Sequence, residues 1–344
     1  MPLIGHILEK GHMPVFAGNR AQQSIVSEAY GKDVPLLPLQ GYDITYSPLN
    51  RVAQAGLLLQ IPRVLRTIRQ EHQWLQEVVR DHKIGGIIAD NRYGLYHATV
   101  PAVIMTHQLH VLSGMGSVAD GLVQRMHYRY LQRFGDVWVA DTAGGHSLAG
   151  MLAQPEVLPK NTKYIGLLSR FANGNNVPTD TSTADTLLVL LSGPEPQRSM
   201  LSQVLWRQAA GYEGRVIFAE GSDKAARPAD IPPHITWHAR LAGSVLEEAM
   251  RAARLVVCRS GYSTLMDLAA IGKRAILIPT PGQTEQEYLG RRMHEQGIHH
   301  TMPQNGFDLG MAVKAAGHLH GYNAIPATAF AAYRHVLDEW LATL

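Results

Sequence analysis

The chain has 344 residues, 46% of them hydrophobic, which is enough for two packed cores of ordinary domain size. Its net charge of +3 suits an anionic ligand or a membrane surface but is too small to indicate a nucleic-acid partner. One cysteine, Cys258, excludes an intrachain disulfide, and no apolar run reaches the ~18 residues of a membrane-spanning helix. With no signal-peptide pattern at its start, the chain is expected to be cytoplasmic.

The beginning of the chain is unusual for an α/β domain. Residues 1–10 have the apolar spacing of a helix, and residues 13–17 have that of a strand. An open α/β domain normally starts with a strand and a glycine-rich turn before such a helix, and the sequence shows neither. We therefore expect the central first strand to be missing and stability to be lowered. Either the true start lies upstream or the chain is truncated.

A long helical pattern occupies 51–82, after a helix pattern at 19–30 and a strand pattern at 34–38. We expect Pro62 to interrupt it, because proline lacks a backbone donor. Basic residues stand beside apolar ones, so this helix could lie on an anionic bilayer. The alternative is a helix that packs on its own sheet and turns a charged face to solvent. The basic residues are Arg63, Arg66 and Arg69.

Two strand patterns, at 84–89 and 101–106, end in polar side chains. Function gathers at the carboxyl ends of strands in α/β folds, so these side chains are candidates for an acceptor site. Asp90 and His107 are the candidate general bases; a helix-capping aspartate and a packed structural histidine are the alternatives. The polar residues are Asp90, Asn91 and Arg92 after the first strand and His107 and Gln108 after the second.

A second α/β set begins after a segment rich in Asn, Gly, Thr and Pro, which we interpret as a linker over 166–186. Ser192 and Gly193 follow the first strand of this set and precede a helix, so they form a strand–glycine turn–helix unit. The expected elements here and just before the linker are a helix at 121–134, strands at 137–141, 187–191, 215–219 and 235–238, and a helix at 242–251.

The most informative stretch starts with the apolar strand pattern 255–258. It stops at Arg259-Ser260-Gly261, and a helix pattern follows at once and ends at Gly272. Unpaired backbone N–H groups and the positive end of the helix dipole suit a phosphate at this turn, and Asp267 could accept hydrogen bonds from a ribose. The alternative is that Ser260 merely caps the helix and Gly261 merely turns the chain. A strand at 275–279, a helix at 283–296 and a final helix at 326–344 complete the pattern.

These residues give the chain a resemblance to family 28 glycosyltransferases. That family carries a Cys-Arg-Ser-Gly turn, an acid six residues after the glycine and then a Gln-Gln pair before an aromatic residue. This chain has Cys258-Arg259-Ser260-Gly261, Asp267 and Gln286-Glu287-Tyr288. The acid is Asp rather than the usual Glu, and Gln-Glu in place of Gln-Gln leaves the donor sugar open.

The resemblance implies roles for individual residues. Ser260, Gly261 and Tyr262, with Arg259 beside them, would bind the donor pyrophosphate, helped by the turn at Ser192 and Gly193. Asp267 would bind the ribose, and Gln286 and Glu287 would contact the donor sugar. On the acceptor side Gln108 matches a family glutamine, whereas His107 falls where the family has a glutamate. The family's N-terminal Gly-x-Gly-His turn is absent, which predicts a damaged acceptor site.

The resemblance also implies the GT-B fold, with two Rossmann-like α/β domains that face a cleft. We expect an acceptor domain at 1–165, the linker at 166–186, a nucleotide-sugar domain at 187–325 and a helix at 326–344 that packs back on the first domain. The activity implied is inverting transfer of a sugar, an N-acetylhexosamine, from a UDP-sugar to a hydroxyl acceptor that could be lipid-linked, with contact to the inner membrane face left open. No Asp-x-Asp occurs, so no metal or other cofactor is expected. A UDP-sugar hydrolase or epimerase and a non-catalytic binding subunit are the alternatives.

Overall fold

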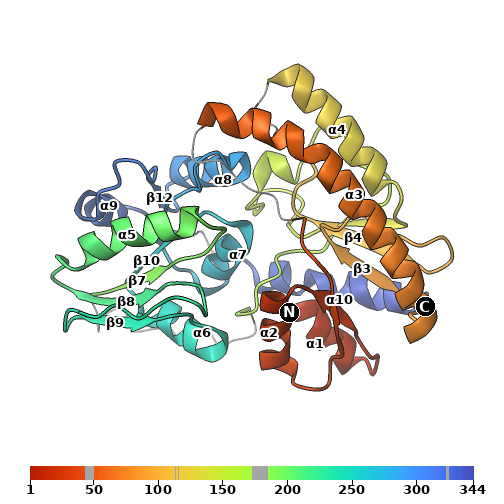
Figure 1. Cartoon of the computed structure of the whole chain (residues 1–344), viewed down its shortest axis with the longest axis horizontal. Helices are drawn as coiled ribbons and strands as arrows, with labels where there is room; N and C mark the ends of the chain where they lie inside the picture. The colour runs from red at the N-terminus through yellow and green to blue at the C-terminus, as the bar shows by residue number, and fades with distance from the viewer. Residues whose placement is uncertain (43–49, 113, 115, 173–184, 323–324) are drawn as a thin grey trace. The chain divides into compact units, whose positions relative to one another are not determined.

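The structure is a computed structural model that describes residues 1–42, 50–112, 114, 116–172, 185–322 and 325–344. The chain divides into two compact units (Figure 1). Unit 1 comprises Met1–Ser47, Arg51–Arg170 and Pro326–Leu344, and unit 2 comprises Pro48–Asn50 and Phe171–Ile325. Most of the expected linker, residues 173–184, lies outside the described residues, as does most of the loop at 43–49.

Unit 1 contains two separate parallel sheets. The larger has the strand order β3-β4-β5-β6, and the smaller pairs β1 with β2. Within the described residues, β1, β2, β3 and β6 each pair on one side only, and the absence of a central first strand stays a prediction. The short β6, which the sequence analysis did not predict, closes the far edge of the larger sheet. The strands are β1 (Phe16–Gly18), β2 (Leu36–Pro38), β3 (Ile87–Asp90), β4 (Ala102–Thr106), β5 (Asp136–Val139) and β6 (Thr162–Tyr164).

Unit 1 contains five α-helices in the described residues, and capping and burial explain how they form. In α2, Asn19 and Gln22 form a reciprocal capping box. The expected interruption at Pro62 was wrong, because α3 runs through it; one missing donor is tolerated in a helix of 33 residues. The arginines predicted to form a charged face on α3 are exposed, while Ile68 and Leu75 are buried. The helices are α1 (Pro2–Glu9), α2 (Arg20–Tyr30), α3 (Asn50–His82), α4 (Ser117–Leu131) and α10 (Ala327–Leu341).

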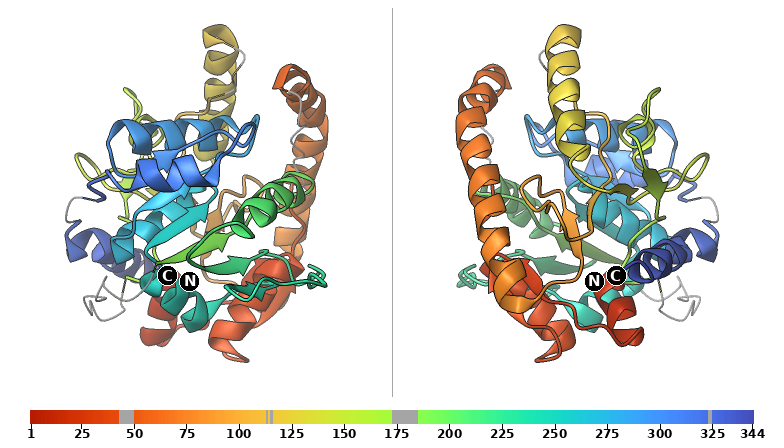
Figure 2. Two further views of the ribbon diagram at one scale, coloured as in Figure 1. Left: turned by 90° about the vertical axis from the view of Figure 1, so that its left-hand side faces the viewer. Right: turned by 90° about the vertical axis from the view of Figure 1, so that its right-hand side faces the viewer.

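The C-terminal helix α10 belongs to unit 1 and packs against α1 and β6. Trp340 of α10 meets the fully buried Trp138 of β5 edge to face, with 5.7 Å between ring centroids. Asp338 accepts hydrogen bonds from His6 of α1 at 2.7 Å and from Lys10 at 2.8 Å. The tryptophan pair thus holds the last helix to the sheet, and the hydrogen bonds of Asp338 hold it to the first helix. Figure 2 shows the chain from two further sides.

Unit 2 is one parallel sheet with the order β12-β11-β10-β7-β8-β9 and helices between the strands (Figure 1). Its core gathers apolar side chains such as Leu187, Phe218, Val257 and Ile276. The chain starts at β7, adds strands on one side and then returns to add β10 on the other, so the switch point lies between β7 and β10. The elements are β7 (Thr186–Leu190), α5 (Gln197–Ala209), β8 (Arg215–Ala219), β9 (Ile235–His238), α6 (Gly243–Ala252), β10 (Leu255–Cys258), α7 (Tyr262–Ile271), β11 (Ala275–Leu277), α8 (Thr284–Glu295), β12 (His300–Thr301) and α9 (Leu309–Ala316).

Candidate functional site

The carboxyl ends of β7 and β10 bring two of the predicted turns together at the switch point of unit 2. Ser192 and Gly193 follow β7 and are exposed, and Arg259 to Gly261 follow β10. Gly193 has φ +103°, a conformation that glycine adopts readily, and a Cβ there would lie 4.0 Å from Oγ1 of Thr280, just past β11. The structure therefore gathers the residues predicted for phosphate binding at one edge of one sheet.

The amino terminus of α7 has the features of an anion site. Gly261 is its N-cap and makes no side-chain capping bond, and a Cβ on Gly261 would have no atom within 4 Å. A ligand can therefore approach the backbone N–H groups of the first turn closely, and the helix dipole favours a negative charge there. The helix ends at Gly272 in the left-handed conformation, as the sequence predicted.

The start of the neighbouring helix α5 is already occupied by an anion from the chain itself, the carboxylate of Glu195. The carboxylate of Glu195 accepts a hydrogen bond from the backbone N–H of Ser199 at 3.2 Å and pairs with Arg198. Burial of the carboxyl group raises its pKa, but the bonds from Ser199 and Arg198 outweigh burial and leave the pKa lowered. Of the two helix starts at the switch point, α7 is thus the one better suited to an external phosphate. Arg198, Glu220 and Gly193 also line a polar hollow beside α5.

Ser260 and Gln286 are held by each other rather than exposed. Ser260 is fully buried, and its hydroxyl donates to the backbone carbonyl of Gln286 at 2.7 Å. The side-chain oxygen of Gln286 accepts from the N–H of Thr280 at 2.9 Å, and that of Glu287 accepts from Gly282 at 3.0 Å. These bonds hold α8 against the turn. The predicted sugar contacts of Gln286 and Glu287, and the phosphate contact of Ser260, stay predictions; Glu287 is the exposed one of the three.

Arg259 lies beneath the turn, with 1% of its surface exposed. Its Nη1 donates to the carbonyls of Ile278 and Pro279, and its Nη2 donates to the carbonyl of Gln197 and to Oε1 of Gln304. Burial lowers the pKa of Arg259 to about 10, so the group stays positively charged at neutral pH. Because Arg259 is buried, it cannot touch a ligand at Gly261 in this structure and can act on one only through its charge. Tyr262 and Asp267 of α7 are buried as well, at 4% and 6% exposed.

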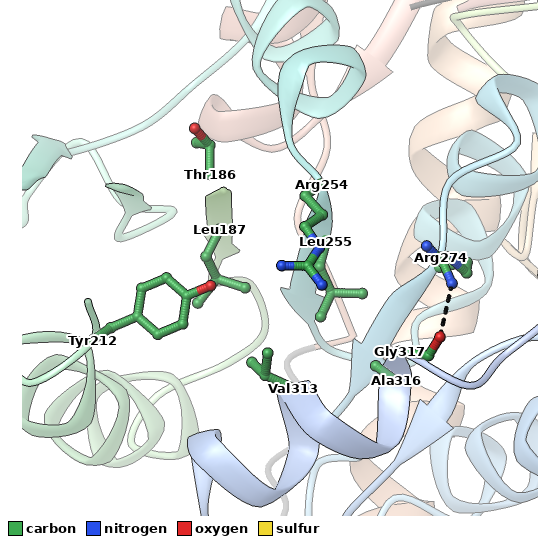
Figure 3. A pocket seen from close by; sticks show the side chains of 9 residues that line it. All are labelled: Thr186, Leu187, Tyr212, Arg254, Leu255, Arg274, Val313, Ala316 and Gly317. Atoms are coloured by element: carbon green, nitrogen blue, oxygen red, sulfur yellow. Dashed lines mark hydrogen bonds between the residues drawn. The ribbon is translucent and has the colours of Figure 1, made fainter. Parts of the chain in front are cut away.

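A different hollow lies at the opposite, amino-terminal ends of β7 and β10 (Figure 3). Tyr212 and Arg254 border it, and Arg254 pairs with Asp185 at 2.7 Å. Arg274 donates to the carbonyl of Gly317 at 3.5 Å. Asp185 thus pairs with the charge of Arg254, Arg274 is held by backbone carbonyls, and the hollow lies away from the predicted turns.

In unit 1 the candidate bases lie together. The parallel register aligns Asp90 with Met105, so His107 follows β4 close to Asp90. Asp90 is open to solvent but surrounded by protein on most sides, and this burial raises its pKa. The positive charges of His107, the amino terminus of Met1 and Arg92 oppose the rise. Asn91 adopts φ 52°, and its N–H donates to Met105 at 3.0 Å, so the loop leaves the sheet sharply.

Arg92 of the predicted acceptor side is bound within its own unit. Its guanidinium pairs with the buried Glu71 of α3 at 2.7 Å, donates to the carbonyl of Gln40 and lies 5.0 Å from the ring centroid of Tyr42. Tyr42 also donates to Glu71 at 2.8 Å. Burial raises the pKa of Glu71, while Arg92 and Tyr42 favour its charged form. A structural role accounts for these contacts of Arg92, and its acceptor contact stays a prediction.

Gln108 is placed by its backbone. Its carbonyl accepts from Nε2 of His127 on α4 at 3.1 Å, and its N–H donates to Thr106 at 3.0 Å. His127 and Glu71, which bond to Gln108 and Arg92, were not predicted from the sequence. Thr280 and Gln304 of unit 2 were not predicted either. Thr280 and Gln304 had only one signal, a position after the end of a strand, which many ordinary residues share; Glu71 and His127 lie inside α3 and α4 and had none.

The comparisons with known proteins agree with this arrangement. Residues 244–310, which contain the α7 turn, match the glycosyltransferase family 28 C-terminal domain. The chain is similar to two curated UDP-N-acetylglucosamine–N-acetylmuramyl-(pentapeptide) pyrophosphoryl-undecaprenol N-acetylglucosamine transferases. It is 30% identical over 282 residues to that of Mycolicibacterium vanbaalenii, covering 74% of this chain and 64% of the relative. It is 26% identical over 306 residues to that of Albidiferax ferrireducens, covering 84% and 70%.

Solved structures show the same fold at low sequence identity. The spinosyn rhamnosyltransferase SpnG with thymidine diphosphate superposes with a TM-score of 0.59 at 16% identity, covering 99% of this chain and 92% of that one. MurG of Acinetobacter baumannii gives 0.50 at 12% identity, covering 99% and 94%. Residues 244–310 are thus a family 28 C-terminal domain, and the chain is a glycosyltransferase of the GT-B fold, similar to the N-acetylglucosamine transferases named above.

Proposed function

We propose that the protein transfers an N-acetylhexosamine from a UDP-sugar to a hydroxyl acceptor, with inversion at the anomeric carbon and without a metal ion. The observation that carries the donor half is the start of α7, open at Gly261, uncapped by any side chain and placed over a buried positive charge. The names of the similar curated transferases, which specify a UDP-N-acetylglucosamine donor, support the choice of donor.

The proposed chemistry is a single displacement. A base takes the proton of the acceptor hydroxyl, whose oxygen bonds to the anomeric carbon while the bond from that carbon to the diphosphate oxygen breaks. UDP leaves with the negative charge, and N–H groups at the start of α7 stabilise it; such preorganised donors contribute roughly 3 kcal/mol each. Asp90 and His107 remain alternative bases. The raised pKa of Asp90 makes it a stronger base than an ordinary aspartate.

Calorimetric titration tests the donor half. UDP, other nucleoside diphosphates and a panel of UDP-sugars would each be titrated with magnesium and again with a chelator. We expect micromolar UDP binding that magnesium does not change, with the tightest UDP-sugar identifying the donor. If no nucleotide binds, the proposal is wrong. If binding requires magnesium, the metal-independent part is wrong.

Kinetics of Asp90→Asn and His107→Gln test the base. The true base should lose about 100-fold or more in kcat, while UDP affinity stays within about twofold, because neither residue belongs to unit 2. Equal small effects in both variants would remove Asp90 and His107 from the mechanism. A variant that loses UDP affinity instead would show that the residue acts on the donor.

We further propose that the acceptor is lipid-linked and that α4 contacts the inner face of the membrane. The similar curated transferases are named for a pyrophosphoryl-undecaprenol acceptor. Leu122 is 69% and Met126 38% exposed on α4, and Arg125 and Arg129 are exposed beside them. Apolar side chains between basic ones suit an anionic bilayer surface. Among the described helices, none is both long and apolar enough to cross a membrane.

Vesicle sedimentation tests this contact. Wild type should bind vesicles that contain phosphatidylglycerol better than vesicles of phosphatidylcholine alone, and Leu122→Gln with Met126→Gln should abolish the difference. Met311→Gln is the matched control, because Met311 is 66% exposed on α9 of unit 2. An equal loss in the control, or no preference for the anionic lipid, would contradict the proposal.

A further inference from the structure

Arg259 is a buried cation, and none of the carboxylates in the described residues pairs with it. Its four hydrogen bonds all go to neutral acceptors, namely three backbone carbonyls and the side-chain amide of Gln304. In the part of the chain that the structure describes, no acidic side chain pairs with it, and its Nε has no hydrogen-bond partner. Buried charges are normally paired, so an unpaired one in a folded domain calls for a reason.

Gln304 keeps this charge uncompensated. Its Oε1 accepts from Nη2 of Arg259 at 2.7 Å, and its Nε2 lies 3.3 Å from Oε1 of Gln197. Both glutamines are buried, at 6% and 2% exposed. A glutamate has nearly the same shape as glutamine and would give Arg259 an ordinary buried salt bridge at this place. The chain instead holds the guanidinium with an amide, which accepts the hydrogen bond without cancelling the charge.

The charge lies where an anion is proposed to bind. Arg259 ends β10 and directly precedes Ser260 and Gly261, the N-cap of α7. A buried charge is screened less than a surface one, so its field extends through the turn to a ligand above it. The positive end of the α7 dipole points at the same place. Two sources of positive potential therefore converge on Gly261, where an added Cβ would have no atom within 4 Å.

We propose that Arg259, left unpaired by Gln304, attracts the diphosphate of the donor nucleotide through its field, without touching it. The proposal rests on the donor site described above and gives both residues a positioning role. The competing explanation is mechanical: Arg259 ties β10 to the end of β11 and the start of α5, and only this bracing matters. A brace needs the hydrogen bonds, whereas the field needs the net charge, so the two explanations are separable.

Gln304→Glu separates them, because it retains the shape and the bond to Arg259 while neutralising the pair. Gln197 can turn its amide to face the new carboxylate, since its Nε2 lacks a partner in the described structure. We expect UDP affinity to fall about 10-fold or more, UMP affinity to fall less and the affinity for uncharged uridine to stay within about twofold. The melting temperature should stay the same or rise. Unchanged UDP affinity in this variant, with normal folding, would overturn the proposal.

Two further variants provide matched controls. Gln304→Met removes the amide but leaves the charge, and Arg259→Lys keeps the charge but loses most of the brace. Both should lower thermal stability yet retain the wild-type ratio of UDP to uridine affinity. If this ratio falls as far in Gln304→Met as in Gln304→Glu, bracing is the correct explanation; these two controls also decide the matter if Gln304→Glu does not fold.

The outcome for wild type separates this inference from the donor site on which it rests. Wild type that binds no nucleotide would overturn both. Wild type that binds UDP tightly, together with a Gln304→Glu variant that binds it equally well, would overturn only the role of the buried charge.

Discussion

Gly261 carries the donor proposal at the scale of a single residue. A Cβ there would meet no atom within 4 Å, and the backbone has φ −72°, so Gly261→Ala should fold normally and retain UDP binding within about threefold. Gly261→Asp puts a carboxylate where the diphosphate would lie and should weaken UDP binding by about 100-fold or more, since like charges repel across a short distance. Calorimetric titration of both variants checks this. Equal UDP affinity in wild type and Gly261→Asp would rule out the α7 turn as the phosphate site.

His299 makes the stability of unit 2 depend on pH. Its Nδ1 accepts from the N–H of Ala275 at 3.1 Å, and its Nε2 lies 2.8 Å from the hydroxyl of Tyr322, which donates to Leu265 at 3.1 Å. This network requires a neutral ring with its proton on Nε2. Burial lowers the pKa of His299 from 6.5 to about 3.

The sign follows from proton uptake. Below pH 6.5 the unfolded chain binds a proton at His299, whereas the folded protein binds one there only below about pH 3. The neutral His299 therefore contributes its full stability above pH 6.5, and this contribution is lost as the pH falls. Between pH 7 and 5 the loss is about 2 kcal/mol. Melting curves at both pH values should show a smaller acid shift for His299→Gln than for wild type, whereas His12→Gln, at an exposed site, should behave like wild type. A wild-type shift in His299→Gln would contradict this network.

The sequence predicted the residues of the α7 turn because they form a contiguous motif. Gly261 and the cap at Gly272 lie where the pattern put them. The partners of the turn could not be predicted in the same way. Gln304 reaches Arg259 from 45 residues further along the chain, and Glu71 reaches Arg92 from an earlier helix. Tertiary packing decides which buried polar groups meet, and the periodicity of the sequence does not predict these pairs.

At the scale of elements, Gly166 shows how closely α10 packs on unit 1. It has φ +76°, and a Cβ would lie 2.2 Å from the carbonyl oxygen of Ala329, in the first turn of α10. Gly166→Ala should therefore destabilise unit 1 by roughly 3 kcal/mol through strain and overpacking, a fall of roughly 6–12 °C in its melting midpoint. Gly11→Ala has the same sign of φ but no neighbour within 4 Å, so strain alone should cost about 1 kcal/mol. Equal shifts in the two variants would show that the contact with α10 contributes nothing.

Most elements were predicted from a cap or a clear apolar run, including the three-residue strands β1, β2 and β11, and three other short elements were not. The helix at 19–30 and the strand at 255–258 follow from caps and apolar runs, and the structure has them as α2 and β10. The elements β6, β12 and α9, which have 3, 2 and 8 residues, were not predicted. Segments this short carry too few side chains to show a period, and edge strands such as β6 and β12 form because a neighbouring strand offers them hydrogen bonds.

At the scale of the whole molecule, the two units share no sheet among their described residues, and each has its own candidate chemistry. The phosphate turn lies in unit 2, and Asp90 and His107 lie in unit 1. UDP should therefore slow hydrogen exchange most strongly in unit 2, at the amides of residues 261–264 and around Ser192 and Gly193, because these N–H groups would gain a ligand acceptor or be shielded by it. Exchange measured by mass spectrometry with and without saturating UDP tests this.

The pattern of protection distinguishes specific binding from a general effect on stability. A ligand that merely stabilises a fold slows exchange in its most protected strands, whereas a ligand at the α7 turn slows exchange at loop and helix-start amides that open locally. The Gln304→Glu variant provides the control, since at equal UDP concentration it should lose the protection at 261–264 while retaining the exchange rates of β10. Protection confined to unit 1 would place the nucleotide in the wrong half of the molecule. That result would overturn the assignment of donor and acceptor to the two units, even though the fold itself would stand.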